Sequence, residues 1–155
     1  MRTGALRRLG GSRVGIWAVK HFFSPLDRRL YRLTGGRLAA TGRPLGPLLL
    51  LTTTGRRTGQ ERTAPVFYLR DGERLVVCHA KPAPDRGPAW PANLRAHPVA
   101  RAQVGAEVAA YRAREATAAE VARYWPRLLA VWPAYATYYA RTGERAIFVL
   151  ERLPG

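Results

Sequence analysis

The stretch LLLLTTTGRRTGQERTAP, residues 48–65, joins two strand patterns through a glycine-bounded loop that carries two arginines. Gly55 and Gly59 permit backbone conformations that other residues avoid, while Arg56 and Arg57 offer planar guanidinium groups suited to phosphate or carboxylate. The loop lacks the Gly-Lys-Ser/Thr ending of a nucleotide P-loop, and a strand pattern rather than a helix follows it. The stretch therefore predicts a β-hairpin whose loop is either an anion site or a basic turn facing water.

Strand patterns continue on both sides of this hairpin. The six expected strands cover residues 48–53, 63–69, 75–78, 99–104, 108–113 and 146–150. Asp71-Gly72 predicts a tight turn between the second and third strands, and Gly105-Ala106 joins the fourth to the fifth. Six antiparallel strands with intervening helices predict a small α+β barrel with helices at its ends.

Helical patterns separate the strands. Residues 88–96 fit a short helix, and the sequence at residues 117–120 forms a capping box that opens an amphipathic helix. Pro126 and Pro133 are expected to interrupt that helix. A second short helix, rich in tyrosine, follows before Gly143 turns the chain into the last strand.

The chain is strongly basic, and the charge is unevenly distributed. Its 155 residues suit one domain, and 26 basic against 10 acidic residues give a net charge of +16. Residues 1–43 alone hold a net charge of +9. Such a field favours anionic partners, namely nucleic acid, an acidic membrane surface or a polyanionic ligand.

Residues 1–43 are interpreted as a basic helical arm, and residues 44–155 as the main domain. Ser24-Pro25-Leu26-Asp27 combines a helix N-cap with proline at the first helical position, and aromatic residues precede it. The arm is expected to touch an anionic membrane surface, to cover a groove as a lid, or to pack on the protein's own core or that of a second subunit. A single cysteine, Cys78, and the lack of a span-length apolar run or a secretory pattern predict a cytoplasmic protein.

Residues able to carry chemistry by themselves are few. His21, His79 and His97 are scattered without a second ligand at metal spacing, so no metal site is predicted. Ser12 and Ser24 lie in the arm, outside any nucleophile elbow. We therefore expect any chemistry to belong to a bound cofactor that the protein positions.

From Leu48 to the C-terminus the chain resembles the deazaflavin-dependent nitroreductase family of actinobacteria, whose members bind coenzyme F420. The resemblance rests on LTTTGRRTGQER at 51–62, PVFY at 65–68, Lys81, PAWPANL at 88–94, HP at 97–98, YWP at 124–126 and WPAY at 132–135 together with Tyr138. It implies a split β-barrel of the FMN-binding-like type, with about six mainly antiparallel strands, flanking helices and an N-terminal helical arm.

The resemblance implies an oxidoreductase that uses reduced F420 to transfer a hydride to an electron-poor acceptor, such as a quinone, an enone or a nitro compound. F420 carries a phosphodiester and an oligoglutamate tail, so arginine forks suit it. The implied cofactor-binding residues are Arg56, Arg57, Thr58, Arg62, Pro65, Phe67, Ala80, Lys81, Pro88, Trp90 and Asn93. Tyr135 and Tyr138 are implied as catalytic, as proton donor or substrate positioner, with both hydroxyls aimed at one cavity.

The chain departs from the family pattern in two places. Residues 80–83 read AKPA where many members have Ser-Lys-Gly-Gly, and Pro91 follows Trp90 where an aromatic residue is common. A non-catalytic F420- or flavin-binding carrier of the same fold therefore stays open as an alternative. A basic nucleic-acid-binding module is a further alternative, which the charge favours although no readout motif is present. The physiological acceptor and the oligomeric state are left open.

Overall fold

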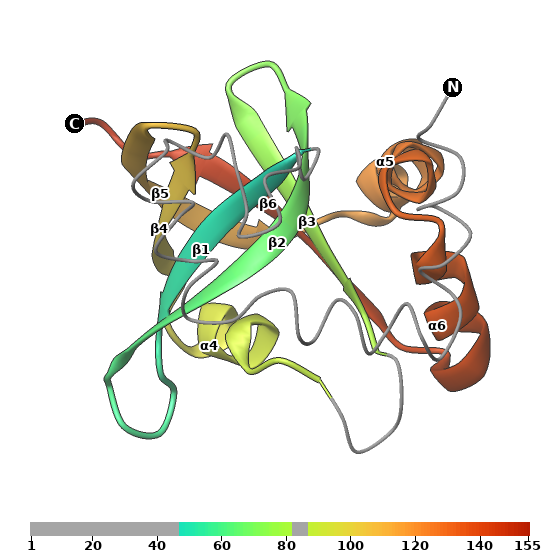
Figure 1. The fold of residues 1–155 in the computed structure, drawn as a ribbon, viewed down its shortest axis with the longest axis horizontal. Helices are drawn as coiled ribbons and strands as arrows, with labels where there is room; N and C mark the ends of the chain where they lie inside the picture. Colours follow the sequence, from blue (N-terminus) through green and yellow to red (C-terminus); the bar gives the residue numbers. More distant parts are fainter. Residues whose placement is uncertain (1–46, 82–86) are drawn as a thin grey trace, which may run out of the picture.

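The computed structural model describes residues 47–81 and 87–155. The predicted arm, its helix start at residues 24–27, and Pro82 and Ala83 lie outside these residues. Within them, six antiparallel strands close into a barrel in the order β1-β2-β3-β6-β5-β4 (Figure 1). The strands are β1 (Leu48–Thr54), β2 (Glu61–Asp71), β3 (Arg74–Ala80), β4 (Val99–Val104), β5 (Glu107–Glu115) and β6 (Arg145–Arg152). This confirms the expected six-stranded α+β barrel.

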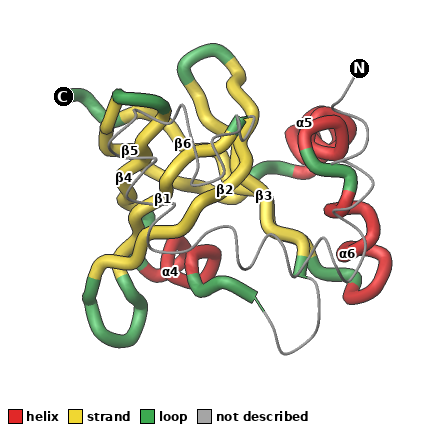
Figure 2. Tube along the Cα trace, viewed as in Figure 1, coloured by secondary structure: helices red, strands yellow, loops and turns green. Residues whose placement is uncertain are grey.

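Three helices of the described chain cover the barrel at two places. They are α4 (Trp90–Ala96), α5 (Ala118–Val131) and α6 (Ala134–Thr142). Figure 2 shows α5 and α6 together on one side of the strands, with α4 below the barrel beside the β1–β2 loop. The β2–β3 and β4–β5 turns lie at the end of the barrel opposite the β1–β2 loop.

Strand β3 explains why the core has two parts. Leu75 and Val77 point into the barrel, whereas Val76 and Cys78 pack outward against the cluster formed with α5 and α6. From Leu75 to Cys78 both faces of this strand are buried, which is why that stretch is continuously apolar rather than alternating. Cys78 is accordingly a buried strand residue, as expected from its place in the pattern.

Two local predictions need correction. Asp71 pairs with Arg74, so the turn residues are Gly72 and Glu73 rather than Asp71 and Gly72. Gly72 adopts φ +60°, a conformation that favours glycine, and this places the turn one residue later. Pro126 lies inside α5 instead of interrupting it. Its position on the exposed side of the helix lets water satisfy the carbonyl that lacks an N–H partner.

The other helix boundaries follow their capping signals. The Thr117 side chain accepts a bond from the Glu120 amide, and the Glu120 carboxylate accepts one from the Thr117 amide, so the predicted capping box is formed. Pro133 lies at the N-cap of α6, and Gly143 ends that helix in the left-handed conformation at φ +65°. This arrangement packs the tyrosine-rich helix α6 against β3.

Candidate functional site

The loop between β1 and β2 is closed by its own backbone. The Gly55 amide donates to the Gln60 carbonyl at 2.7 Å, and the Gly59 amide donates to the Gly55 carbonyl at 2.8 Å. A Cβ atom on Gly55 would lie 3.0 Å from that Gln60 oxygen, and Gly59 has φ +70°. Glycine therefore suits both positions better than other residues do, and the two backbone hydrogen bonds hold the shape of the loop.

Helix α4 holds this loop through one buried amide. Asn93, 2% exposed, accepts a hydrogen bond from the Arg56 amide through Oδ1 and donates one to Thr53 Oγ1 through Nδ2, both at 3.1 Å. The family resemblance implies that Asn93 binds the cofactor, and in the structure its amide joins α4 to the loop. The contact spans residues forty positions apart in the chain.

We predict that Asn93→Ala lowers the free energy of unfolding by about 1–3 kcal/mol, because it leaves the buried Thr53 hydroxyl and the Arg56 amide without these partners. Denaturant unfolding measures the change. Gln103→Ala, which removes an amide that bonds the Gly105 carbonyl elsewhere in the barrel, is the matched control. An Asn93→Ala variant as stable as the parent would show that this tether contributes nothing.

Three arginines surround the loop without an acidic partner among the described residues. Arg56, Arg57 and Arg62 are exposed, and none of them forms an ion pair there. The acid within the loop segment, Glu61, is already bound by Arg101 at 2.8 Å. Thr58, the remaining predicted loop residue, accepts a bond from the Gln60 amide at 3.3 Å. The loop thus presents guanidinium groups that are free to bind an anion.

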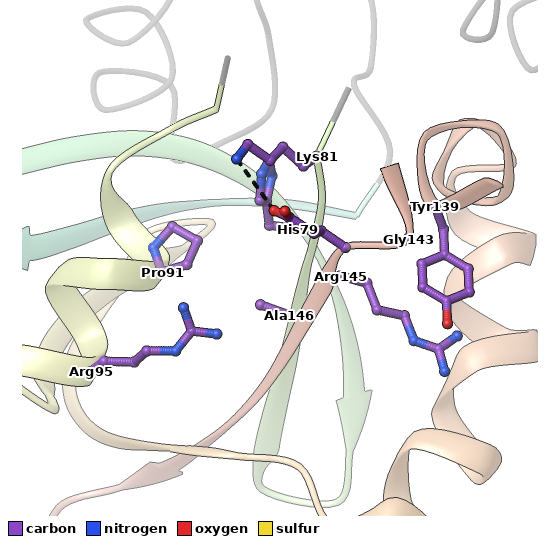
Figure 3. A pocket seen from close by; sticks show the side chains of 9 residues that line it. His79, Lys81, Pro91, Arg95, Tyr139, Gly143, Arg145 and Ala146 are labelled. Atoms are coloured by element: carbon purple, nitrogen blue, oxygen red, sulfur yellow. Dashed lines mark ion pairs between the residues drawn. The ribbon is translucent and has the colours of Figure 1, made fainter. Parts of the chain in front are cut away.

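A pocket of about 470 Å³ lies between α4, α6 and the paired ends of β3 and β6. Figure 3 shows His79 and Lys81 at one side of it and Pro91 and Arg95 of α4 at another. The remaining wall comes from the residues that end α6 and begin β6, namely Tyr139, Gly143, Glu144, Arg145 and Ala146. Its volume is in the range typical of small-molecule sites.

The pocket is electrostatically positive. Burial, and then the nearby Lys81, lower the pKa of His79 to about 4 against the opposing effect of Glu144, so this imidazole is neutral at pH 7. Lys81 Nζ lies 3.3 Å from Glu144 Oε2. With Arg95 and Arg145 the lining has three cationic side chains against one carboxylate. Such a pocket favours ligands that carry negative charge.

The lowered pKa of His79 predicts a stability loss in acid. The unfolded chain takes up a proton near pH 6.5 that the folded chain accepts only near pH 4. Stability is therefore complete above pH 6.5 and falls by roughly 3 kcal/mol as the pH drops through this window. Urea unfolding of His79→Gln should lack this part of the loss, whereas the exposed His97→Gln should keep it. The hydrogen bond from Arg114 lowers the pKa of Glu120 from 4.5 to about 2, so the stability that Glu120 contributes is lost only at lower pH than the His79 contribution.

Ala80, Tyr135 and Tyr138 lie together in the buried cluster between α6 and the outer face of β3 and β6. Tyr135 is 6% exposed, and its hydroxyl makes no hydrogen bond to any described residue. Burial, with Cys78 and Tyr138 nearby, raises the pKa of Tyr135 well above its usual value, and burial also raises that of Tyr138. Both phenols therefore stay protonated. The Tyr135 hydroxyl is buried without a partner among the described residues, which is uncommon enough to require an explanation.

The other predicted site residues are dispersed. Pro65 and Phe67 face outward from β2, where the Phe67 ring stacks on Trp132 at 5.0 Å. Trp90 is buried in the barrel core, with its ring edge-on to Phe148 at 5.8 Å. Pro88 is exposed just before α4. The structure thus groups Arg56, Arg57, Thr58, Arg62 and Asn93 at one loop, and Ala80, Tyr135 and Tyr138 beside α6.

Sequence reasoning placed only Lys81 of the pocket residues in the binding site and missed His79, Arg95 and Arg145. Side chains alternate along a strand, so the sequence predicts that His79 faces the opposite side of β3 from Cys78. No sequence pattern near Arg95 predicts that it lines the same pocket as His79. Tyr139, which follows Tyr138 on the tyrosine-rich helix α6, lines the pocket, whereas Tyr135 and Tyr138 do not. Its ring lies 4.2 Å from the Arg145 guanidinium carbon.

Over the described ranges, 47–81 and 87–155, no His, Cys, Asp or Glu residues gather in a group of three or more able to hold a metal ion. The same part of the chain contains no helix that is both long and apolar enough to cross a membrane.

Comparison with known sequences gives a consistent family. A model described as F420H(2)-dependent quinone reductase matches residues 26–152. An F420H(2)-dependent quinone reductase of Mycobacterium tuberculosis is 37% identical over 92 residues, which are 57% of this chain and 62% of that protein. The match therefore spans less than two thirds of that relative's length. Another M. tuberculosis relative is 34% identical over 91 residues, covering 59% of this chain and 76% of that protein.

Comparison with solved structures agrees with the barrel. An F420-H2 dependent reductase, FDR-A, is 28% identical with a TM-score of 0.61, covering 68% of this chain and 95% of that chain. A protein described as a domain-swapped dimer is 24% identical with a TM-score of 0.63, covering 88% of this chain and 98% of that chain. The second likeness concerns the fold alone.

Proposed function

Since this chain belongs to the F420H(2)-dependent quinone reductase family, we propose that it oxidises reduced F420 and reduces a quinone. The observation that carries the proposal is the β1–β2 loop, which is fixed by Asn93 and presents three arginines without acidic partners among the described residues. A cationic loop that is already ordered binds an anion without the entropy cost of ordering the loop and without the energy cost of breaking ion pairs.

The residues present fit this polyanionic cofactor. Arg56, Arg57 and Arg62 would hold its phosphodiester and nearby tail carboxylates, because guanidinium groups bind both bidentately. Thr58 would add a hydroxyl donor, whereas Lys81 lies apart from the loop, in the pocket beside α6. When bound, reduced F420 supplies a hydride from the C5 carbon of its deazaflavin ring.

Tyr135 is the residue we propose as proton donor. Its phenol stays protonated because burial raises its pKa, and its hydroxyl has no hydrogen-bond partner among the described residues. Tyr135 lies in the buried cluster behind Tyr139 and does not line the pocket, so the cluster must open for its hydroxyl to reach a ligand. Once reached, a donor without a protein partner is suited to bond a ligand oxygen that becomes negative during reduction. Tyr138 on the same helix face would position that ligand, and Ala80 beside them leaves room where the family often has a serine.

Steady-state kinetics test the proposal directly. Mixing the full-length protein with reduced F420 and menadione should restore the absorbance of oxidised F420 at a rate proportional to protein concentration. Menadione should be consumed in equal amount, because one two-electron reduction matches one oxidation. Tight F420 binding without turnover would overturn the proposed activity and leave a carrier protein of the same fold.

We also propose that the protein is cytoplasmic and that its N-terminal arm contacts anionic membrane. Deleting residues 1–24, which precede the family match, should leave F420 affinity nearly unchanged. The deletion should reduce sedimentation with anionic liposomes, because it removes a basic segment. Equal sedimentation of both proteins would exclude the membrane contact, and loss of F420 binding in a folded truncation would make the arm part of the site.

A further inference from the structure

The pocket beside α6 has an apolar wall and a cationic rim. Pro91 and Ala146 form the wall, and the Tyr139 ring stands at one edge (Figure 3). Lys81 and Arg95 reach toward the cavity from opposite elements, the end of β3 and helix α4. A planar apolar ring with a negatively charged substituent complements both surfaces, because the ring meets the wall while its charge meets the rim.

Both cations keep donors for such a ligand. Glu115 Oε1 accepts bonds from Nε and Nη2 of Arg95, which leaves Nη1 of the guanidinium without a protein partner in the described chain. The Arg95 side chain is 50% exposed, so a ligand can reach it. Lys81 shares its ammonium with Glu144 at 3.3 Å, and an ammonium has three N–H donors. The Glu144 carboxylate, in contrast, repels an anionic ligand and competes with it for the Lys81 ammonium.

We propose that this pocket binds a planar aromatic anion, which, resting on the proposed function, is a quinone acceptor carrying an acidic hydroxyl or carboxylate. The pocket volume of about 470 Å³ accommodates a two-ring molecule. In the reaction the quinone gains a hydride and a proton and becomes a hydroquinone, while reduced F420 gives up one hydride and releases one proton. The substrate class is thus set by charge as well as by redox chemistry.

Binding of a non-reducible probe tests the pocket without F420. Calorimetric titration of the full-length protein with naphthoate and with neutral naphthalenemethanol should show naphthoate binding at least about tenfold tighter. Arg95→Gln should weaken naphthoate binding about tenfold, because one charged donor is lost. Glu144→Gln should strengthen it, because repulsion is removed and Lys81 is released. Arg112→Gln, an exposed arginine on β5 outside the pocket, should have no effect.

Equal affinity for the two probes, or an unchanged naphthoate affinity in both Arg95→Gln and Glu144→Gln, would overturn the anion site. Turnover then tests the acceptor. The KM for a hydroxynaphthoquinone should rise in Arg95→Gln while that for menadione stays constant, and a parallel change in both would overturn the assignment. Absence of turnover with every quinone, together with the expected naphthoate pattern, would contradict the proposed function and leave the binding site supported.

Discussion

Replacing Arg56, Arg57 and Arg62 together by alanine is expected to weaken F420 binding by at least about 100-fold at low salt. Each charged hydrogen-bonded contact that is lost costs about 1–3 kcal/mol, and three partly coupled losses exceed the 2.8 kcal/mol or so that a 100-fold change needs. The three side chains are exposed and make no ion pair among the described residues, so their removal breaks no such internal contact. Fluorescence titration of F420 measures the affinity.

The control for this variant carries the same change in net charge. Arg70, Arg74 and Arg112 are also exposed, and the first two lie at the end of β2 and β3 opposite the loop. Alanine at these three positions should change F420 affinity only slightly, through the weakened overall field. Equal losses in the two triple variants would show that F420 responds to net charge and that the loop is merely a basic turn.

Tyr135→Phe is expected to lower kcat by roughly 10²-fold while leaving F420 affinity intact, because a lost general acid affects the chemical step rather than binding. The variant should be at least as stable as the parent, since it removes a buried hydroxyl that has no partner among the described residues. Rapid mixing of the protein, loaded with reduced F420, against menadione gives the rate of the step, and denaturant unfolding gives the stability.

Tyr111→Phe is the matched control for this substitution. Tyr111 is 5% exposed in the barrel core and lies on β5, away from α6. Its variant should turn over at the parent rate. Parent-like rates in Tyr135→Phe and in Tyr138→Phe would mean that these tyrosines only pack the helix against the sheet, and the assignment of the substrate side would be wrong.

The barrel was predictable because its signals are local. Gly55 and Gly59 marked the first loop, and the structure shows why glycine suits both positions: a Cβ on Gly55 would lie 3.0 Å from the Gln60 carbonyl oxygen, and Gly59 has φ +70°. The Thr117 capping box fixed the start of α5. The same local reasoning placed the β2–β3 turn one residue early, because Asp71-Gly72 is a common turn pair while register is decided by the whole strand.

The sequence predicted which candidate site residues lie together only where those residues belong to one continuous segment. The loop arginines follow one another in sequence, whereas the Asn93 amide reaches Thr53 across forty positions, and no spacing rule reveals that contact. Likewise Arg95 lines the same pocket as His79 and Lys81 only because α4 packs under the barrel. The three-residue spacing of Tyr135 and Tyr138 correctly predicted a shared face, but not that this face is buried beside Cys78.

The claim that fixed arginines hold the anionic part of F420 is tested most directly by comparing two ligands on the unmodified protein. One is F420, and the other is its deazaflavin fragment, which has neither the phosphodiester nor the glutamate tail. We predict that F420 binds at least about 100-fold more tightly than the fragment, with an advantage that shrinks as salt is added. Equal affinities at low salt would contradict it, because the loop would then make no contribution to binding the cofactor.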